Sequence, residues 1–497
     1  MNSENSALTT RLGKGLLKSV SNPPAKLLIL LAILLLALAL RSYPLFLQSF
    51  PDPDFYYHSR MSQLAYQQGG VPTYDSLSYG GRQYTYYPFH HASIAFLAKA
   101  TGTPVETILP IATLIIALLA VIATYLLAQR LFGEKAGILT ALAAAVHSGF
   151  VARSAAFARP DEYALLLIPL SLLLLLQENK LSYALLFVLF AFFPLVHLPA
   201  AVVGLFIFAI CTLAARGKTL ESAKKIAAAL LGMLAGSTYY FGWDFKQLIA
   251  SKGFAASAEM AALDFSFLIF YSGVLLVFAG VAAWEISKKL ALKDYSGGQM
   301  QNAKLLLAWL ATTFLLQLAA NRNVIFFAPA ICVAAGIGMK HALEKSGKYE
   351  KHLLTITLLA LAISSATFLS VQQPGFSAND VEAAKWLGEN SKGGLVAAHW
   401  DRGHLLTAYG SRVVADGYFE YAPSPEKKVA ALEQMLASGD ASQVLSLAVQ
   451  NGVEFVFLDE ASLAQLAENS VWRSAPAGFE KAFDKGAQVW RLKEKLE

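Results

Sequence analysis

The sequence predicts a polytopic α-helical membrane protein that ends in an extracytoplasmic α/β domain. Of its 497 residues, 56% are hydrophobic and only 15% are charged, a balance that excludes an ordinary soluble protein. Apolar runs such as 26–47, 105–131 and 352–371 reach the roughly 20 residues that cross a bilayer. After Val371 these runs stop, and shorter helical and strand patterns replace them.

Hydropathy predicts about eleven membrane spans. They lie near residues 26–47, 105–131, 135–151, 162–177, 181–196, 198–215, 223–242, 265–286, 303–320, 323–341 and 352–371. If the N-terminus is cytoplasmic, the lysine-rich loops all fall on the cytoplasmic side, as the positive-inside rule requires. The first apolar run has no small-residue cleavage site after it, so we expect a retained span and not a signal peptide. We therefore expect a multi-pass protein of the cell membrane whose C-terminal residues lie outside.

Two domains are expected. Residues 1–371 form the membrane domain, which includes a long first outer loop at 48–103, and residues 372–497 form the outer domain. The outer domain has about 125 residues, an ordinary size for a domain. Its expected elements are helices at 380–390 and 427–448 and strands at 395–399 and 453–458.

The first outer loop begins with an acidic pair, Asp52 and Asp54. Carboxylates at a membrane boundary are costly unless a cation or water meets them. The following residues, 55–68, have the spacing of an amphipathic helix in the membrane interface, and Gly69 and Gly70 end it. A solvated loop pair is the alternative interpretation, but the place of the pair directly after the first span favours a functional site.

A second outer turn holds two arginines and two carboxylates, Arg153, Arg159, Asp161 and Glu162. Both acidic residues are expected in the first turn of the next helix, where negative charge is favourable, and this helix-start role is the alternative to a functional one. Adjacent residues do not share a helix face, so only one of the two should point at a site.

Two further outer features are Glu259, which lies among small residues, and Arg322, which lies at the start of a span. Taken alone, Glu259 is an exposed loop residue, and Arg322 is an arginine that reaches lipid headgroups. Together with Asp54 and the Asp161–Glu162 pair they form a set that suits Mg²⁺ or Mn²⁺ and a lipid-linked phosphate. In this interpretation Arg322 binds the phosphate through two hydrogen bonds from its planar guanidinium group.

Composition excludes other classes of site. The net charge of +6 is spread over short loops and does not indicate a nucleic-acid partner. Cys211 and Cys332 both fall inside apolar spans, so neither a disulfide framework nor a thiolate metal site is expected.

Several motifs, in order along nearly the whole chain, resemble the catalytic subunit of oligosaccharyltransferase, a member of the GT-C class of polyprenyl-linked glycosyltransferases. Asp54-Phe55-Tyr56-Tyr57-His58 resembles the first acidic motif of that family, and the run from Arg153-Ser154 to Asp161-Glu162 resembles the second. Glu259 and Arg322 resemble its mobile-loop glutamate and its late arginine. His399-Trp400-Asp401-Arg402-Gly403 resembles its Trp-Trp-Asp-Tyr-Gly signature, without the first Trp and the Tyr.

The resemblance implies inverting transfer of a glycan from a polyprenyl phosphate or diphosphate to the asparagine of an Asn-x-Ser/Thr acceptor polypeptide. Asp54, Asp161, Glu162 and Glu259 would hold Mg²⁺ or Mn²⁺, with Asp54, Glu259 and Arg322 as the catalytic residues. Trp400 and Asp401 would bind the acceptor hydroxyl, and Arg153 and His58 are further candidates for substrate contact.

Two alternatives remain. The altered signature allows a GT-C transferase that modifies a lipid or a surface glycan and uses no sequon. A non-enzymatic lipid or solute carrier is the other alternative, but carriers tend to place ionisable residues near the bilayer midplane and to show internal repeats. Here the ionisable residues gather at the expected outer boundary, which favours an enzyme.

Overall fold

The chain forms two compact units in the computed structural model, which describes residues 23–84, 86–240, 265–419, 422–474 and 476–493. The helical unit comprises Met1–Tyr43, Ile111–Phe241 and Ser257–Gln372. Of the described residues, the mixed unit comprises those within Pro44–Pro110 and Gln373–Glu497. The first outer loop, predicted to be part of the membrane domain, groups in this division with the C-terminal residues.

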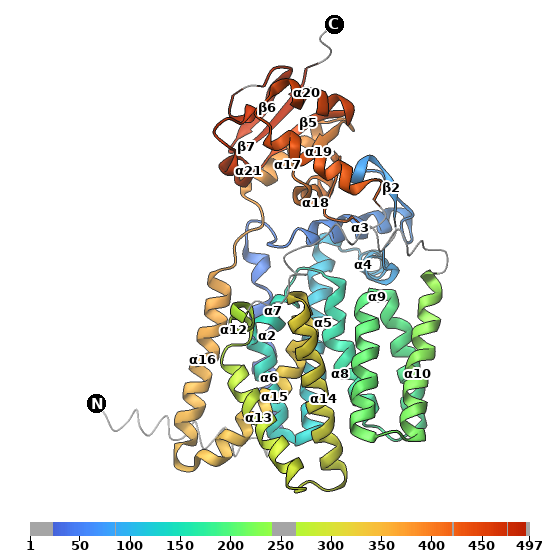
Figure 1. Ribbon diagram of the computed structural model, residues 1–497, viewed down its shortest axis with the longest axis vertical. Helices are drawn as coiled ribbons and strands as arrows, with labels where there is room; N and C mark the ends of the chain where they lie inside the picture. The colour runs from blue at the N-terminus through green and yellow to red at the C-terminus, as the bar shows by residue number, and fades with distance from the viewer. Residues whose placement is uncertain (1–22, 85, 241–264, 420–421, 475, 494–497) are drawn as a thin grey trace, which may run out of the picture. The chain divides into compact units, whose positions relative to one another are not determined.

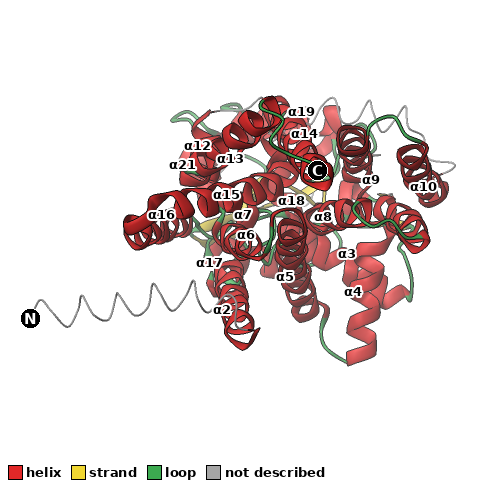
Figure 2. Cartoon of the chain, turned by 90° about the horizontal axis from the view of Figure 1, so that it is seen from below, coloured by secondary structure: helices red, strands yellow, loops and turns green. Residues whose placement is uncertain are grey.

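The helical unit is a bundle whose helices are seen nearly end on in Figure 2. Its helices are α2 (Pro23–Arg41), α5 (Val105–Phe132), α6 (Glu134–Val146), α7 (Ser148–Ala152), α8 (Tyr163–Leu175), α9 (Lys180–Arg216), α10 (Leu220–Ser237), α12 (Phe265–Ser272), α13 (Val274–Ala291), α14 (Gly297–Ala319), α15 (Val324–Ser346) and α16 (Glu350–Ser370). The 3₁₀ turns η3 (Pro160–Glu162) and η6 (Asn321–Asn323) precede α8 and α15.

Apolar length confirms a membrane location. Among the described residues, four helical stretches are long and apolar enough to cross a membrane, and a pair bent by 87° would make a fifth. They are Val105–Phe132, Lys180–Arg216, Gly297–Ala319 and Asn321–Ser370, with the bent pair at Ser266–Ser272 and Val274–Ala291. Two of the stretches break inside, one at His197 (φ −160°, ψ 99°) and one at the turn Gly347–Tyr349. Both breaks fall between expected spans, and the number and orientation of the spans stay predictions.

Helix α15 lies at the centre of the helical unit, against α6, α13 and α14 (Figure 1). Its residues from Val324 to Met339 are all buried, which explains why this stretch is apolar on every side. Glycines let its neighbours approach closely, since a Cβ at Gly338 would lie 1.8 Å from the Phe278 carbonyl oxygen. Because α15 is tightly packed, the turn η6, which precedes it and carries Arg322, is attached to a rigid helix.

The C-terminal part of the mixed unit is a five-stranded sheet in the order β4-β3-β5-β7-β6. The strands are β3 (Leu395–Ala397), β4 (Arg412–Val413), β5 (Val453–Leu458), β6 (Phe479–Lys485) and β7 (Ala487–Leu492), and β3 runs parallel to β4 and β5 while β7 is antiparallel to its neighbours. In β5, Val456 and Leu458 pack into one core and Phe455 and Phe457 into the other. Burial on both faces explains its continuous apolar run.

The helices of the sheet domain are α17 (Ala378–Asn390), α18 (Gly403–Ala408), α19 (Pro425–Ala437), α20 (Ala441–Gln450) and α21 (Glu460–Gln465). The single helix expected over 427–448 was wrong, because α19 ends at Ala437 and α20 starts anew. Asp440 caps α20 and accepts hydrogen bonds from the Ser442 and Gln443 amides. Such a cap requires a non-helical residue before the helix, which divides the pattern.

The first outer loop contributes α3 (Asp54–Gln68), a short hairpin of β1 (Tyr74–Asp75) and β2 (Arg82–Gln83), and α4 (Pro88–Thr101). The helix expected over 55–68 is confirmed, and it ends at Gly69 in the left-handed conformation (φ 73°). The helix was expected to lie in the lipid interface. For one of its faces this expectation was wrong, because Tyr56 and Tyr57 are 7% and 3% exposed and pack inside the mixed unit. Tyr56 stacks edge-on with Phe376, and Tyr57 lies 5.1 Å from the His404 ring.

A buried cluster of histidines and tyrosines joins α3 to α4. His91 hydrogen-bonds through Nε2 to His58 Nδ1 (2.8 Å) and through Nδ1 to the Tyr84 hydroxyl (2.5 Å). Burial, helped by the positive charges of His90 and Arg60, holds the pKa of His91 well below its ordinary value. His91 is therefore neutral in the folded protein at neutral pH.

We expect the protein to lose stability as the pH falls below about 6.5, the pKa of an unfolded histidine. Because the folded-state pKa of His91 is lower, the unfolded state binds more protons in this range, which costs up to about 1.4 kcal/mol per pH unit. The measurement is the unfolding temperature of the detergent-purified protein as a function of pH. His91→Gln, which cannot titrate, should flatten the profile, and an unchanged slope in this variant would contradict the assignment.

Candidate functional site

In the helical unit, the second acidic motif forms a compact turn between α7 and α8. Arg153 ends α7, and the chain runs on to Pro160, which opens η3. Asp161 and Glu162 lie in this 3₁₀ turn and not in the first turn of the following α-helix, so the expected helix-start position was wrong by one element. Proline at the first position of η3 suits the start of a helical turn, because it lacks an amide donor and its φ is fixed.

Glu162 is the unusual residue of this turn. It is 1% exposed, and neither of its carboxylate oxygens has a hydrogen-bond partner among the described residues. Asp161 is 7% exposed and lies 3.7 Å from the Arg159 guanidinium (Oδ1 to Nε). A buried carboxylate without partners is costly, so native structures rarely keep one without a functional reason.

The charges around the turn differ in their effects on the two acids. Burial alone would raise the pKa of Asp161, but the positive charges of Arg159, Arg153, His197 and Arg322 lower it below its ordinary value. Burial and the neighbouring charge of Asp161 raise the pKa of Glu162 well above its ordinary value. The turn thus brings together four of the predicted site residues, Asp161, Glu162, Arg153 and Arg322. A bound cation would compensate the charge of the two carboxylates, and carboxylate oxygens are the ligands that a hard divalent ion prefers.

A buried arginine, which was not among the predicted site residues, is hydrogen-bonded to the start of this turn. Arg41, at the end of α2, is 0% exposed. It donates hydrogen bonds to the carbonyls of Ala144 (2.8 Å) and Ala145 (3.0 Å) and to the Ser154 hydroxyl (2.8 Å). Its own carbonyl accepts from the Ala156 amide (3.1 Å). Arg41 therefore fixes the start of the turn to the end of the first helix.

The turn η6 carries Arg322 and is fixed by amide side chains. Gln317 Nε2 donates to the Asn321 carbonyl (3.2 Å), and Asn323 Nδ2 donates to the Leu316 carbonyl (2.7 Å). These contacts bind the turn back to the end of α14. Arg322 is half-buried, and its charge acts on Asp161 as described above.

The first-loop residues belong to the mixed unit. Asp54 opens α3, where its backbone amide donates to Asp52 Oδ1 (2.9 Å). His58 lies one helical turn further on and is 3% exposed, hydrogen-bonded to His91. This burial gives His58 a place in the packing of α3 on α4, and its expected contact with substrate stays a prediction.

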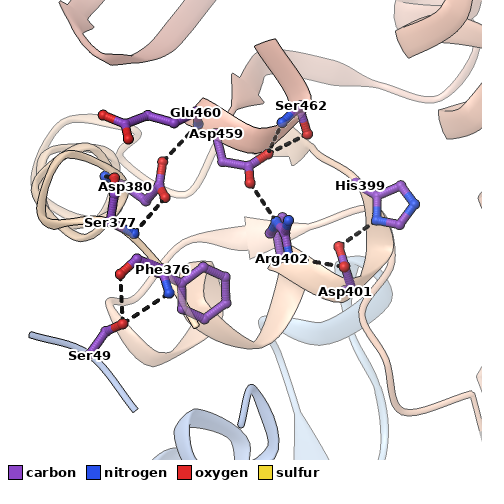
Figure 3. A network of polar contacts seen from close by, with 10 residues as sticks. All are labelled: Ser49, Phe376, Ser377, Asp380, His399, Asp401, Arg402, Asp459, Glu460 and Ser462. Carbon is purple, nitrogen blue, oxygen red and sulfur yellow. Dashed lines mark hydrogen bonds and ion pairs between the residues drawn. The ribbon is translucent and has the colours of Figure 1, made fainter. Parts of the chain in front are cut away.

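The altered signature lies in a polar network of the mixed unit, shown in Figure 3. Trp400 and Asp401 start the 3₁₀ turn η8 (Trp400–Arg402). Asp401 Oδ1 contacts His399 Nδ1, and Asp401 Oδ2 accepts from Arg402 Nη1 (2.9 Å), while Arg402 Nε reaches Asp459 (2.7 Å). Burial alone would raise the pKa of Asp401, but His399 and Arg402 lower it, so its carboxylate is charged and already bound.

No three His, Cys, Asp or Glu side chains gather into a metal site within the part of the chain that the structure describes. Of the four predicted ligands, Glu259 lies outside the described residues, Asp54 belongs to the mixed unit, and Asp161 and Glu162 share one turn. Arg159 and His197 were not among the candidate site residues. Both stand in expected outer turns on the same side as Asp161, and that shared side is the signal that would have found them.

The comparisons with known proteins agree on the fold. Residues 87–241 match the family model described as dolichyl-phosphate-mannose-protein mannosyltransferase. A search of curated protein sequences found no match.

Solved structures match over nearly the whole chain. The oligosaccharyltransferase AglB of Archaeoglobus fulgidus, in complex with an inhibitory peptide and a dolichol-phosphate, is 14% identical with a TM-score of 0.67 over 90% of this chain and 71% of that one. Arabinofuranosyltransferase AftD from Mycobacteria is 18% identical (TM-score 0.61; 94% and 40%). ArnT of Cupriavidus metallidurans, bound to undecaprenyl phosphate, is 13% identical (TM-score 0.58; 93% and 96%).

The matches confirm the resemblance that the motifs indicate, and they support a glycosyltransferase of the membrane. At these identities they establish the fold and leave the acceptor open. The chain therefore has the GT-C fold of the polyprenyl-linked membrane glycosyltransferases.

Proposed function

We propose that the protein transfers a glycan from a polyprenyl phosphate or diphosphate to the asparagine of an Asn-x-Ser/Thr acceptor, with the help of a divalent metal ion. The observation that carries the proposal is Glu162, buried without a hydrogen-bond partner among the described residues beside Asp161. The arginines around the same turn supply the positive charge that a phosphate needs.

Each residue has a proposed role. Asp161 and Glu162, with Asp54 and Glu259, would hold Mg²⁺ or Mn²⁺, and that ion would stabilise charge on the departing phosphate oxygen. Arg322 and Arg153 bind the phosphate through their planar guanidinium groups. Trp400 and Asp401 bind the acceptor hydroxyl. The acceptor nitrogen would attack the anomeric carbon directly, which inverts its configuration.

The solved structures of similar proteins support the kinds of partner. The archaeal oligosaccharyltransferase was solved with a dolichol-phosphate, with a tethered acceptor peptide that contains an NVT sequon, and with Zn and sulfate. ArnT was solved with undecaprenyl phosphate. A bound polyprenyl phosphate is thus common to two matches, whereas the acceptor peptide belongs to one.

One observation favours a second candidate, a GT-C transferase that acts on a lipid or a surface glycan. Both oxygens of Asp401 already accept hydrogen bonds within the mixed unit, from His399 and Arg402. A peptide hydroxyl would have to share these oxygens, which still have free lone pairs. The altered signature therefore fits acceptors other than a sequon as well.

The test supplies the full-length protein with Mn²⁺, the lipid-linked oligosaccharides of the cells that produce it, and an Asn-x-Thr peptide. Glycopeptide should form with this peptide and not with the matched Gln-x-Thr peptide. Glycan release to lipid acceptors without any glycopeptide would reject the asparagine acceptor and favour the second candidate. Equal transfer to both peptides would also reject asparagine as the acceptor.

A further inference from the structure

A cavity of about 650 Å³ opens beside α3 in the mixed unit, and none of its lining residues belongs to the candidate site described above. Its walls are residues 44–50, the side of α3, residues 75–77, residues 407–410 and Glu106. We call it the α3 cavity. Its volume lies in the range of small-molecule sites, which is about 300–1,000 Å³.

The α3 wall is a row of uncharged polar groups. Ser59, Gln63 and Gln67 all line the cavity, and each follows the last by one helical turn. An amide side chain can both donate and accept hydrogen bonds. Neither glutamine makes a hydrogen bond to any residue that the structure describes, so both amides are available to a ligand.

Two of the three charged groups that line the cavity neutralise each other, and the third, Glu106, is exposed. Arg60 donates to both oxygens of Asp75, at 2.6 and 2.5 Å. Burial alone would raise the pKa of Asp75, but the hydrogen bonds from Arg60 lower it below its ordinary value, so the pair is ionic. This bidentate pair has no net charge, and the remaining charge of the lining is the exposed carboxylate of Glu106, which can accept hydrogen bonds from hydroxyl groups. The lining therefore disfavours an anionic ligand and suits one that is rich in neutral polar groups.

Aromatic rings also line the cavity. Phe50 and Phe55 stack with their centroids 3.4 Å apart, and Tyr56 and Tyr409 line the same space. Sugar rings offer C–H faces that pack on aromatic rings and hydroxyl edges that bond amides and carboxylates. A lipid chain would leave the amides unpaired, at a cost in free energy.

From this lining we infer that the α3 cavity binds an uncharged oligosaccharide. The inference rests on the proposed function, in that the glycan of the donor is the oligosaccharide that the protein would meet. The amides of Gln63 and Gln67 bond its hydroxyl groups, and the Tyr409 ring packs on a sugar face. An acceptor peptide is the competing occupant, and the test separates the two.

The probe is the free oligosaccharide that mild acid releases from the lipid-linked pool of the producing cells. Its affinity for the full-length protein in detergent is measured by titration calorimetry, without metal and without transfer, so the result does not depend on activity. Gln63→Ala/Gln67→Ala should bind it about tenfold more weakly, which corresponds to about 1.4 kcal/mol. Gln68→Ala is the matched control, because this glutamine is on the same helix and exposed, outside the cavity lining, and it should bind normally.

A second pair of variants tests whether the Tyr409 ring contributes to binding. Tyr409→Phe keeps the aromatic face and should keep the affinity, whereas Tyr409→Ala should lose it about tenfold. Alanine is a good helix former, so the double glutamine variant should fold, and its unfolding temperature confirms this. Wild-type affinity in the double variant and in Tyr409→Ala, or no binding of the oligosaccharide to the wild type, would overturn the inference. So would a raised KM for acceptor peptide with unchanged oligosaccharide affinity, which would identify a peptide site. None of these results would exclude glycan transfer itself.

Discussion

Glu162→Gln is expected to lower the rate of glycan transfer by roughly 10²–10³-fold or more, the usual effect of losing one group that stabilises transition-state charge. The same variant should fold as stably as the wild type or more stably. Glu162 is 1% exposed and neither oxygen has a hydrogen-bond partner among the described residues, so the buried carboxylate costs stability in the absence of metal. Gain of stability with loss of activity is the mark of a functional residue. Initial transfer rates and unfolding temperatures measure the two effects.

Asp161→Asn provides the comparison. Asp161 lies 3.7 Å from Arg159 and offsets the charge of the surrounding arginines, so its loss should destabilise the protein as well as lower the rate. Titration with Mn²⁺ shows which variant has lost metal affinity and so which acid binds the ion. Glu285→Gln, whose carboxylate pairs with Lys345 at 3.1 Å, is a control that should transfer normally. A wild-type rate in Glu162→Gln would reject the metal-site proposal.

Local patterns predicted much of the fold. The strand at 453–458 was predicted with its observed bounds, because the sheet buries both faces of β5 and leaves an unbroken apolar run. The end of α3 was readable from Gly69, whose left-handed conformation glycine adopts without strain. The break between α19 and α20 was not, since the helical period continues across it and only the Asp440 cap marks the new start.

The candidate site was predicted in part, and the missing part is non-local. Asp161, Glu162, Arg153 and Arg322 could be named because charges at expected outer turns are rare and conspicuous. Which of the two acids lacks hydrogen-bond partners among the described residues could not be read from α-helix geometry, since both lie in the 3₁₀ turn η3. The contacts of Arg41 were invisible because its partners Ala144, Ala145 and Ser154 lie more than 100 residues further along the chain.

Arg41→Met is expected to destabilise the protein by about 2–4 kcal/mol, because several buried acceptors lose their donor together. These acceptors are the carbonyls of Ala144 and Ala145 and the Ser154 hydroxyl, all within 3.0 Å of the guanidinium. Arg41→Lys should recover only part of the loss, since an ammonium group cannot match the planar fork that spans the three acceptors. The unfolding temperature in detergent measures the loss, and wild-type stability in Arg41→Met would contradict the role.

Ser154→Ala separates positioning from stability. It removes the hydrogen bond from Arg41 Nε and leaves the two carbonyl contacts in place, so it should cost only about 1 kcal/mol. The turn that carries Arg153, Arg159, Asp161 and Glu162 then loses one of its attachments to α2 and keeps the bond from the Ala156 amide to the Arg41 carbonyl, so we expect weaker Mn²⁺ activation at an almost unchanged unfolding temperature. Ser171→Ala is the matched control, because the side chain of Ser171 bonds the Ile168 carbonyl inside α8 and no other group of the described residues. If Mn²⁺ activation is the same in both serine variants, Arg41 contributes only to the stability of the bundle. If only Ser154→Ala weakens the activation, the contact with α2 sets the position of the acidic pair.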